Sequence, residues 1–243
     1  MLGGRAAPSD PPMIPIRVDG AERAPVTRAL IGLNLLIFVG LWLLGPGADG
    51  PLRQFGWVPA RMTSAESWRM LGPIEQLGPL LTHGFLHVGV LHLLGNLWAL
   101  HLFGGAVESR VGARPFALLY AGGLTLAATC HALAAPDSVV PMVGASGAIA
   151  GVMGACLALD PGARVLTLVP IPIPTAARIP SWLLIGLWAM LQLLAVSAGS
   201  ATGVAWWAHL GGFAFGGLWG LARRWPPTWA LRRLPHRRTR MIR

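Results

Sequence analysis

Apolar residues gather into six runs, separated by short segments rich in proline, glycine and arginine. The runs cover residues 27–44, 88–107, 115–134, 146–159, 180–198 and 204–222. A transmembrane helix needs about 20 predominantly apolar residues, and five of the six runs approach that length. The pattern therefore predicts an all-α membrane protein with six transmembrane helices.

The composition also indicates a membrane protein, but the high positive charge needs an explanation. Charged residues make up 12% of the chain and hydrophobic residues 54%, whereas soluble domains are about a quarter charged. All 19 basic residues are arginine, and the net charge of +10 could indicate nucleic-acid binding. Eight of these arginines, however, follow the last apolar run, where cytoplasmic positive charge orients a membrane protein. We therefore expect the lipid bilayer as a partner and no nucleic acid.

Arginine placement also predicts the topology. An even number of spans puts both termini on one side, and most arginine-bearing loops fall on that side, which should be cytoplasmic. The first loop, residues 45–87, then faces outward. We expect a polar cytoplasmic N-terminal tail over 1–25, a six-helix membrane domain over 26–222 and an arginine-rich cytoplasmic tail over 223–243.

The fourth run is too short to cross a bilayer alone. It extends from Ser146 to the stop at Asp160-Pro161-Gly162, roughly 21 Å of helix against a hydrocarbon core of roughly 30 Å. If Asp160 marks the cytoplasmic surface, Ser146 lies below the outer one. The irregular backbone before Ser146 would then be buried in protein or line a wet cavity. The pattern predicts a serine in a submerged aqueous pocket.

Small residues recur at four-residue spacing in the fourth and sixth runs. The two stripes are Gly147, Gly151 and Ala155, and Gly212, Gly216 and Gly220. One such stripe alone is common helix packing with no chemical role. Here each stripe starts near a reactive side chain, Ser146 in the fourth run and His209 in the sixth, toward the same outer end. We expect the stripes to face each other and to bring Ser146 and His209 together.

The second run carries His92 and Asn96, which lie four residues apart on one helical face. They could be polar residues that join helices. Alternatively, they are hydrogen-bond donors toward a developing oxyanion, together with the backbone N–H of Ser146 at the start of its helix. Polar side chains inside a membrane are functional-site hypotheses by default, and a serine, a base and donors are the parts of a hydrolase.

His83 and His87 also share helical spacing, which raises the alternative of a metal site. No carboxylate or cysteine joins them, and His92 follows five residues after His87, off an ideal ligand face. We therefore predict no metal and no cofactor. His87 is interpreted as a tether for the loop that enters the second run.

Together these motifs resemble those of rhomboid intramembrane serine proteases of the six-span bacterial kind. The matching segments are Phe-Leu-His at 85–87, His-Leu-Leu-Gly-Asn at 92–96, Gly-Ala-Ser-Gly at 144–147 and Ala-His-Leu-Gly-Gly at 208–212, with Trp68-Arg69 and Glu108. The resemblance implies a compact rhomboid-like bundle whose short fourth helix opens at the catalytic serine. It also implies that Ser146 is the nucleophile, that His209 is its base, and that His92, Asn96 and the Ser146 N–H form an oxyanion hole.

The reaction implied by the resemblance is endopeptidase cleavage of transmembrane segments of other membrane proteins near the outer face, through an acyl-enzyme, in a bacterial inner membrane. Every Asp and Glu falls in a loop or tail, so we expect a Ser-His dyad without an orienting acid. A catalytically silent relative is one rival, against which the intact Ser146 and His209 argue. A channel is the other, but the cytoplasmic halves of the second, fourth and sixth runs are Leu, Ala and Gly.

Overall fold

The computed structural model of the protein describes residues 24–45, 49–169, 175–199 and 203–224. The expected tails fall almost entirely outside these residues. Each of the six apolar runs is helical within the described part of the chain. The corresponding elements are α1 (Pro25–Leu43), the continuous α7 (Val90–Ala99), η3 (Leu100–Gly104) and α8 (Gly105–Val111), α9 (Ala113–Ala134), α10 (Ser146–Leu159), α11 (Ser181–Ser197) and α12 (Trp206–Arg224).

Among the described residues, three helical segments are long and apolar enough to cross a membrane, namely Pro25–Leu43, Val90–Val111 and Ala113–Ala134. The helices Ser146–Leu159 and Ser181–Ser197 are apolar but shorter. Large apolar side chains are exposed along α1 and α11, among them Leu36 and Leu194. Such broad exposed apolar surfaces mark contact with lipid or another apolar partner. The prediction of a mostly helical membrane protein is confirmed.

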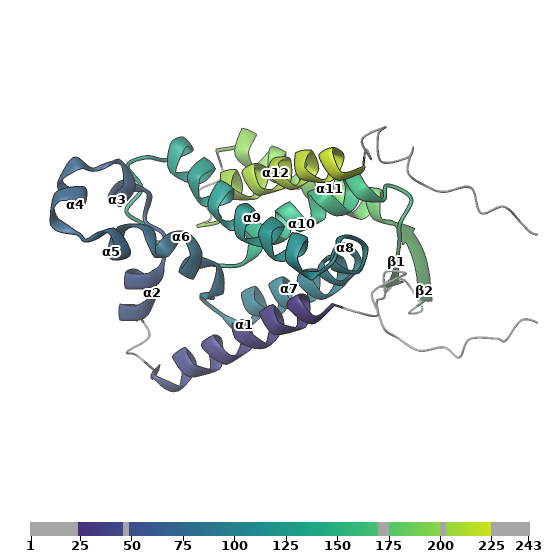
Figure 1. Ribbon diagram of the computed structural model, residues 1–243, viewed down its shortest axis with the longest axis horizontal. Helices are drawn as coiled ribbons and strands as arrows, with labels where there is room; N and C mark the ends of the chain where they lie inside the picture. Colours follow the sequence, from purple (N-terminus) through teal and green to yellow (C-terminus); the bar gives the residue numbers. More distant parts are fainter. Residues whose placement is uncertain (1–23, 46–48, 170–174, 200–202, 225–243) are drawn as a thin grey trace, which may run out of the picture.

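The first loop is more structured than its sequence predicts. From residue 49 onward it forms five short helices, α2 (Asp49–Phe55), α3 (Pro59–Thr63), α4 (Ala65–Met70), α5 (Pro73–Leu77) and α6 (Pro79–Thr82), and a 3-10 turn, η2 (His83–Phe85). Three of these helices start at a proline, a position where the missing N–H is not needed. Figure 1 shows that the short helices gather at one end of the molecule.

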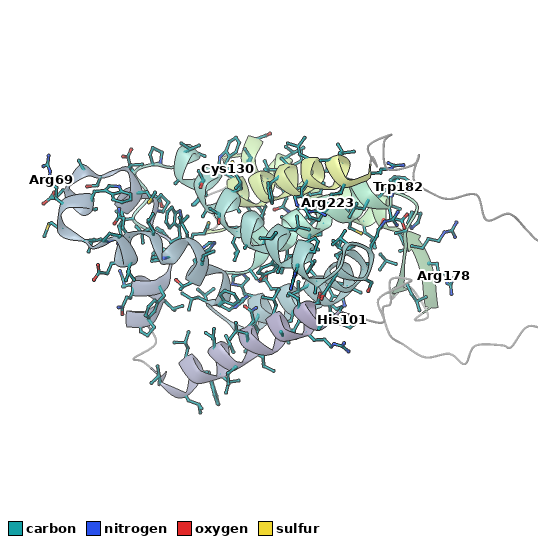
Figure 2. The ribbon with its side chains drawn as sticks, viewed as in Figure 1. Arg69, His101, Cys130, Arg178, Trp182 and Arg223 are labelled. Atoms are coloured by element: carbon teal, nitrogen blue, oxygen red, sulfur yellow. The ribbon has the colours of Figure 1, made fainter. Side chains whose placement is uncertain are left out.

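The segment between α10 and α11 forms a β-hairpin, which the sequence pattern does not predict. Strands β1 (Arg164–Val169) and β2 (Thr175–Pro180) pair antiparallel, with Arg164 opposite Pro180. Val165, Thr167 and Val169 are β-branched residues at alternate positions, a composition that favours extended backbone. The hairpin projects from the end of the molecule opposite the short helices of the first loop (Figure 1). Arg69 and Arg178 accordingly lie at opposite ends (Figure 2).

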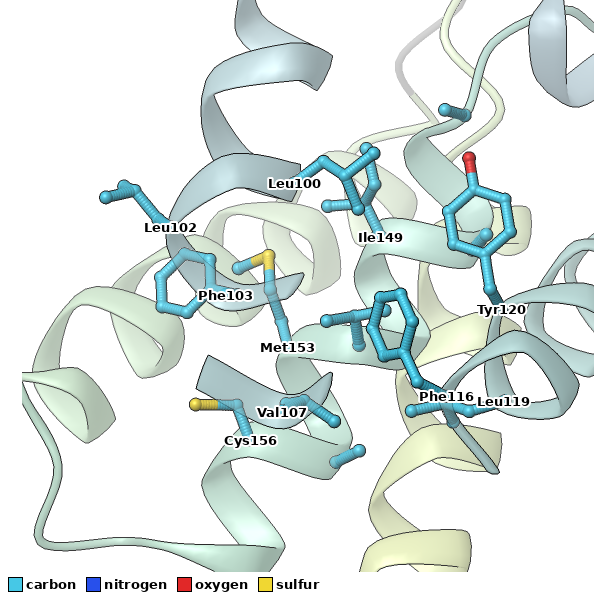
Figure 3. Packing of buried hydrophobic residues seen from close by; sticks show 14 of the residues in the cluster. Leu100, Leu102, Phe103, Val107, Phe116, Leu119, Tyr120, Ile149, Met153 and Cys156 are labelled. Atoms are coloured by element: carbon cyan, nitrogen blue, oxygen red, sulfur yellow. The ribbon is translucent and has the colours of Figure 1, made fainter. Parts of the chain in front are cut away.

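Helix α10 forms the centre of the fold. Eleven of its 14 residues are buried, as expected for a helix that is apolar on all sides. It packs against α12 on one side and α9 on another. In the core, Ile149 and Met153 of α10 meet Phe116 of α9 and Phe103 of η3 (Figure 3). The helix that begins at Ser146 is therefore held by neighbours around most of its circumference.

Candidate active site

The backbone that leads into Ser146 has a conformation that requires glycine. Gly144 adopts a φ of +117°, and a Cβ added there would lie 2.7 Å from Cε1 and 2.8 Å from Nε2 of His92. The Gly144 N–H donates to the His83 carbonyl at 2.9 Å, and Met142 pairs with Trp57 in a short β-bridge. The first loop and the second span thus hold the irregular segment before Ser146 in place.

Ser146 is the first residue of α10, and its Oγ lies 2.8 Å from Nε2 of His209 on α12. The glycine stripes bring these residues together. A Cβ at Gly212 would overlap the Gly147 carbonyl oxygen, and a Cβ at Gly216 would overlap that of Gly151. The two stripes therefore face each other in matching register, and this prediction from the sequence is confirmed.

His209 has a second hydrogen-bond partner that the sequence reading does not identify. Its Nδ1 lies 2.7 Å from Oε1 of Gln192 on α11, and both side chains are almost fully buried. The rings of Trp188 and Trp206 lie 5.8 and 6.1 Å from the His209 ring, centroid to centroid. The signal for Gln192 is its position as a lone amide inside an apolar run, since polar groups in membrane helices are rare.

A cavity of about 250 Å³ opens beside the serine. Its polar lining consists of the four residues predicted from the sequence, Ser146, His209, His92 and Asn96, and its remaining walls are apolar or glycine. Asn96 is 6% exposed, and its Nδ2 donates to the His92 carbonyl at 2.8 Å. The sequence-predicted residues, from three different helices, therefore line one cavity.

His83 and His87 lie next to this pocket in the first loop. His83 is 1% exposed, and its Nδ1 lies 2.7 Å from the Pro79 carbonyl oxygen. His87 packs edge-on against His92, with ring centroids 5.0 Å apart. The pKa of each imidazole is lowered to about 4, mainly by burial, and for His87 the nearby His92 contributes to this lowering. Within the described ranges, no group of three or more His, Cys, Asp or Glu side chains could hold a metal ion.

Comparison with known proteins gives the same family as the motifs. The model of the rhomboid domain matches residues 74–226, which is more than half of the chain. Rhomboid protease GluP of Bacillus subtilis is 35% identical over 134 residues, which cover 54% of this chain and 24% of that protein. Rhomboid protein 1, mitochondrial, of Saccharomyces cerevisiae is 31% identical over 205 residues, 79% of this chain and 51% of that protein.

The matches thus span a quarter to a half of these relatives' own lengths. The described residues also include helices that are long and apolar enough to cross a bilayer. Together with the rhomboid matches, these helices identify the chain as an integral membrane protein. Because the domain match includes the second, fourth and sixth helical runs with their His92, Ser146 and His209 motifs, the chain belongs to the rhomboid family.

Proposed function

We propose that this chain is an intramembrane serine endopeptidase that cleaves transmembrane segments of other membrane proteins near the outer face. The observation that carries the proposal is the 2.8 Å contact between Ser146 Oγ and His209 Nε2, at a cavity also lined by His92 and Asn96. A serine within hydrogen-bond distance of an imidazole is the arrangement expected of an activated nucleophile and its base. Two of the relatives named rhomboid proteases come from Bacillus subtilis.

In the proposed reaction, His209 Nε2 takes the Ser146 hydroxyl proton as Oγ attacks a peptide carbonyl carbon. His209 then gives that proton to the leaving amine as the C–N bond breaks, which leaves an acyl-enzyme. Water attacks the ester in a second round, with His209 again acting first as base and then as acid. Each step uses only these two side chains for proton transfer, so the unit is a dyad.

Charge on the carbonyl oxygen needs donors during both attacks. The Ser146 N–H is one, because the first four N–H groups of an α-helix have no partner inside the helix. The Asn96 amide carries two N–H protons, of which the His92 carbonyl takes one, so the second can serve an oxyanion. His92 borders the same cavity. We assign these three groups to the oxyanion hole.

The position of the cavity limits the class of substrate. A polypeptide must enter the cavity in extended form to present a carbonyl to Ser146, whereas a regular helix engages its carbonyls in its own hydrogen bonds. The substrate is therefore a transmembrane segment with helix-weakening Gly, Pro or polar residues near the cut. Small residues next to the scissile bond fit a cavity of about 250 Å³.

We further propose six membrane spans, with the shorter α10 and α11 and the glycine-rich α12 completing a rhomboid-like bundle over residues 26–222. The protein would reside in a bacterial inner membrane, with both terminal tails cytoplasmic. The distribution of arginine supports this orientation. Arg110 and Asp160 form an ion pair of 3.0 Å where α8 and α10 end, a charged level that suits the cytoplasmic surface. Arg69 of the first loop and Arg178 of the hairpin lie at opposite ends of the molecule (Figure 2). This placement fits a first loop that faces outward and a hairpin that faces the cytoplasm.

A fluorophosphonate probe, which labels activated serines, tests the proposal directly. The full-length protein should be labelled, and Ser146→Ala and His209→Ala should each abolish labelling and cleavage of a helix-destabilised membrane substrate. Because the two side chains act as one unit, the double variant should be hardly worse than either single variant. Ser197→Ala, at an exposed position on α11, is the control and should react normally. Labelling that survives Ser146→Ala would reject the proposal.

A further inference from the structure

Gln192 is a buried amide in an otherwise apolar stretch of α11. Its side chain is 5% exposed, and a buried amide destabilises a protein unless its polar atoms are hydrogen-bonded. Both ends of this amide have partners. Nε2 donates to the Trp188 carbonyl at 3.2 Å, and Oε1 lies 2.7 Å from Nδ1 of His209. The amide is therefore oriented from both sides.

These two contacts determine which nitrogen of His209 carries the proton. A carbonyl oxygen only accepts, so the end of Gln192 that faces the Trp188 carbonyl is the NH2 group and the end that faces His209 is Oε1. The reverse orientation would set two acceptors against each other at Trp188. Since Oε1 accepts as well, Nδ1 of the neutral imidazole is its N–H, and Nε2 carries the lone pair. Nε2 is the nitrogen that faces Ser146 Oγ.

We propose that Gln192 is a positioning residue, which holds His209 in the tautomer and ring orientation that the reaction of Ser146 requires. This inference rests on the proposed function, because it concerns the same dyad. The proton moves from Ser146 Oγ to His209 Nε2 as the Oγ–C bond forms, and on to the leaving amine as the C–N bond breaks. Gln192 gains and loses no proton. Its Oε1 accepts the Nδ1–H throughout and stabilises the imidazolium by its dipole.

The two described aromatic side chains that pack on His209 do not supply this acceptor. Trp188 and Trp206 confine the ring from two sides, but an indole N–H is only a donor. The titratable groups that act on His209 are the imidazoles of His92 on α7 and His131 on α9, and a positive charge on either would oppose the imidazolium. Oε1 of Gln192 is thus the group that fixes Nδ1–H.

Two substitutions separate positioning from packing. Gln192→Met keeps the length of the side chain and fills its space, but offers no acceptor of comparable strength to Nδ1–H. Gln192→Glu keeps an acceptor oxygen and adds a negative charge beside the ring. Ser197→Ala on the same helix is the matched control, since it removes a hydrogen bond to a backbone carbonyl four residues earlier, that of Leu193, as both Gln192 variants remove the bond to Trp188.

The measurements are kcat, KM, pH profile, melting temperature and rate of fluorophosphonate labelling on the full-length protein. Gln192→Met should lower kcat and the labelling rate roughly ten- to a hundredfold, as expected for a misplaced base, with KM and melting temperature close to those of wild type. Gln192→Glu should retain more activity than Gln192→Met. The acid limb of its pH–activity profile should move to higher pH, because a carboxylate favours the charged imidazolium and so raises the pKa of His209. A side chain that only packs would leave the kcat and the labelling rate of Gln192→Met unchanged.

The outcomes also distinguish this inference from the proposed function. If the wild-type protein is labelled and Gln192→Met has an unchanged kcat, the role of Gln192 is rejected and the proposed dyad is retained. If Gln192→Met does not fold, a Gln192→Glu profile that coincides with the wild-type profile rejects that role equally. Wild-type protein without Ser146-dependent labelling rejects the proposed function, and this inference with it.

Discussion

Gly216 of α12 lies so close to Gly151 of α10 that a Cβ at Gly216 would overlap the Gly151 carbonyl oxygen. One turn earlier on each helix, Gly212 stands in the same relation to Gly147. These backbone contacts fix the separation between the two helices that carry Ser146 and His209. A single hydrogen bond of 2.8 Å then spans the remaining distance between the two side chains.

Gly216→Ala should therefore impair both stability and activity, whereas Gly217→Ala should impair neither. A methyl group at Gly216 forces the helices apart, which should lower the free energy of unfolding by about 1–3 kcal/mol. A displacement of about 1 Å at the proposed dyad can cost roughly a hundredfold in rate. At Gly217 the nearest atom to an added Cβ is 4.0 Å away, so a methyl group fits. Melting temperature and probe labelling measure both effects, and equal losses in the two variants would contradict the explanation.

The glycine stripes could be predicted from the sequence because their spacing is a local property of each helix. The same holds for the start of α10 at Ser146, which follows the Gly144-Ala145 turn. Gln192 could not be predicted in this way. An acid is the residue type expected to orient a histidine base, whereas the partner of His209 is a neutral amide on another helix, and nothing local in the sequence pairs the two.

Two further differences have a similar origin. Glu108 falls at the end of an apolar run and reads as a loop residue, but it lies inside α8 and is 1% exposed. Its carboxylate accepts from the N–H groups of Val26 and Thr27 and from the Thr27 hydroxyl, at 2.7 to 2.9 Å. The hairpin Arg164–Pro180 likewise depends on pairing between two segments. Periodicity along one segment does not reveal a partner far along the chain.

Glu108→Gln should destabilise the fold, because an amide presents an NH2 group where the first N–H groups of α1 need an acceptor. A loss of about 1–3 kcal/mol in the free energy of unfolding is expected from an unsatisfied buried donor. Glu66→Gln is the control, since Glu66 is exposed on α4. Thermal unfolding in micelles compares the two variants. Equal melting temperatures would show that the Glu108 carboxylate does not hold α1.

Acidification should loosen the first loop around His83. Burial lowers the pKa of His83 from 6.5 to about 4, so the unfolded loop binds a proton more readily than the folded loop. The stabilisation is therefore complete above about pH 6.5 and is lost as the pH falls toward about 4, by about 1.36 kcal/mol per pKa unit and about 3 kcal/mol in all. Amide hydrogen exchange of residues 80–86 and of Gly144, corrected for intrinsic rates, should show this loss of protection.

His83→Gln is the control for this pH dependence. Glutamine can still donate to the Pro79 carbonyl but does not titrate in this range, so the loss of protection with acid should become smaller. A remainder is expected from His87, whose pKa is also lowered to about 4. If wild type and His83→Gln lose protection in parallel, His83 is not the group that senses the pH.

The last prediction separates an oxyanion role of Asn96 from a role in packing, and α1 supplies a matched control. Asn34 is also buried, and its Nδ2 donates to the carbonyl four residues earlier at 2.8 Å, as the Nδ2 of Asn96 does. Asn96→Ala should lower kcat roughly a hundredfold with little change in KM or melting temperature, since an oxyanion donor acts mainly in the transition state. Asn34→Ala should lower the melting temperature and leave kcat unchanged.

His92→Ala should resemble Asn96→Ala, impaired but active, because the Ser146 N–H remains. If Asn96→Ala keeps full turnover and melts several degrees lower, Asn96 is structural and the oxyanion must be held by other donors.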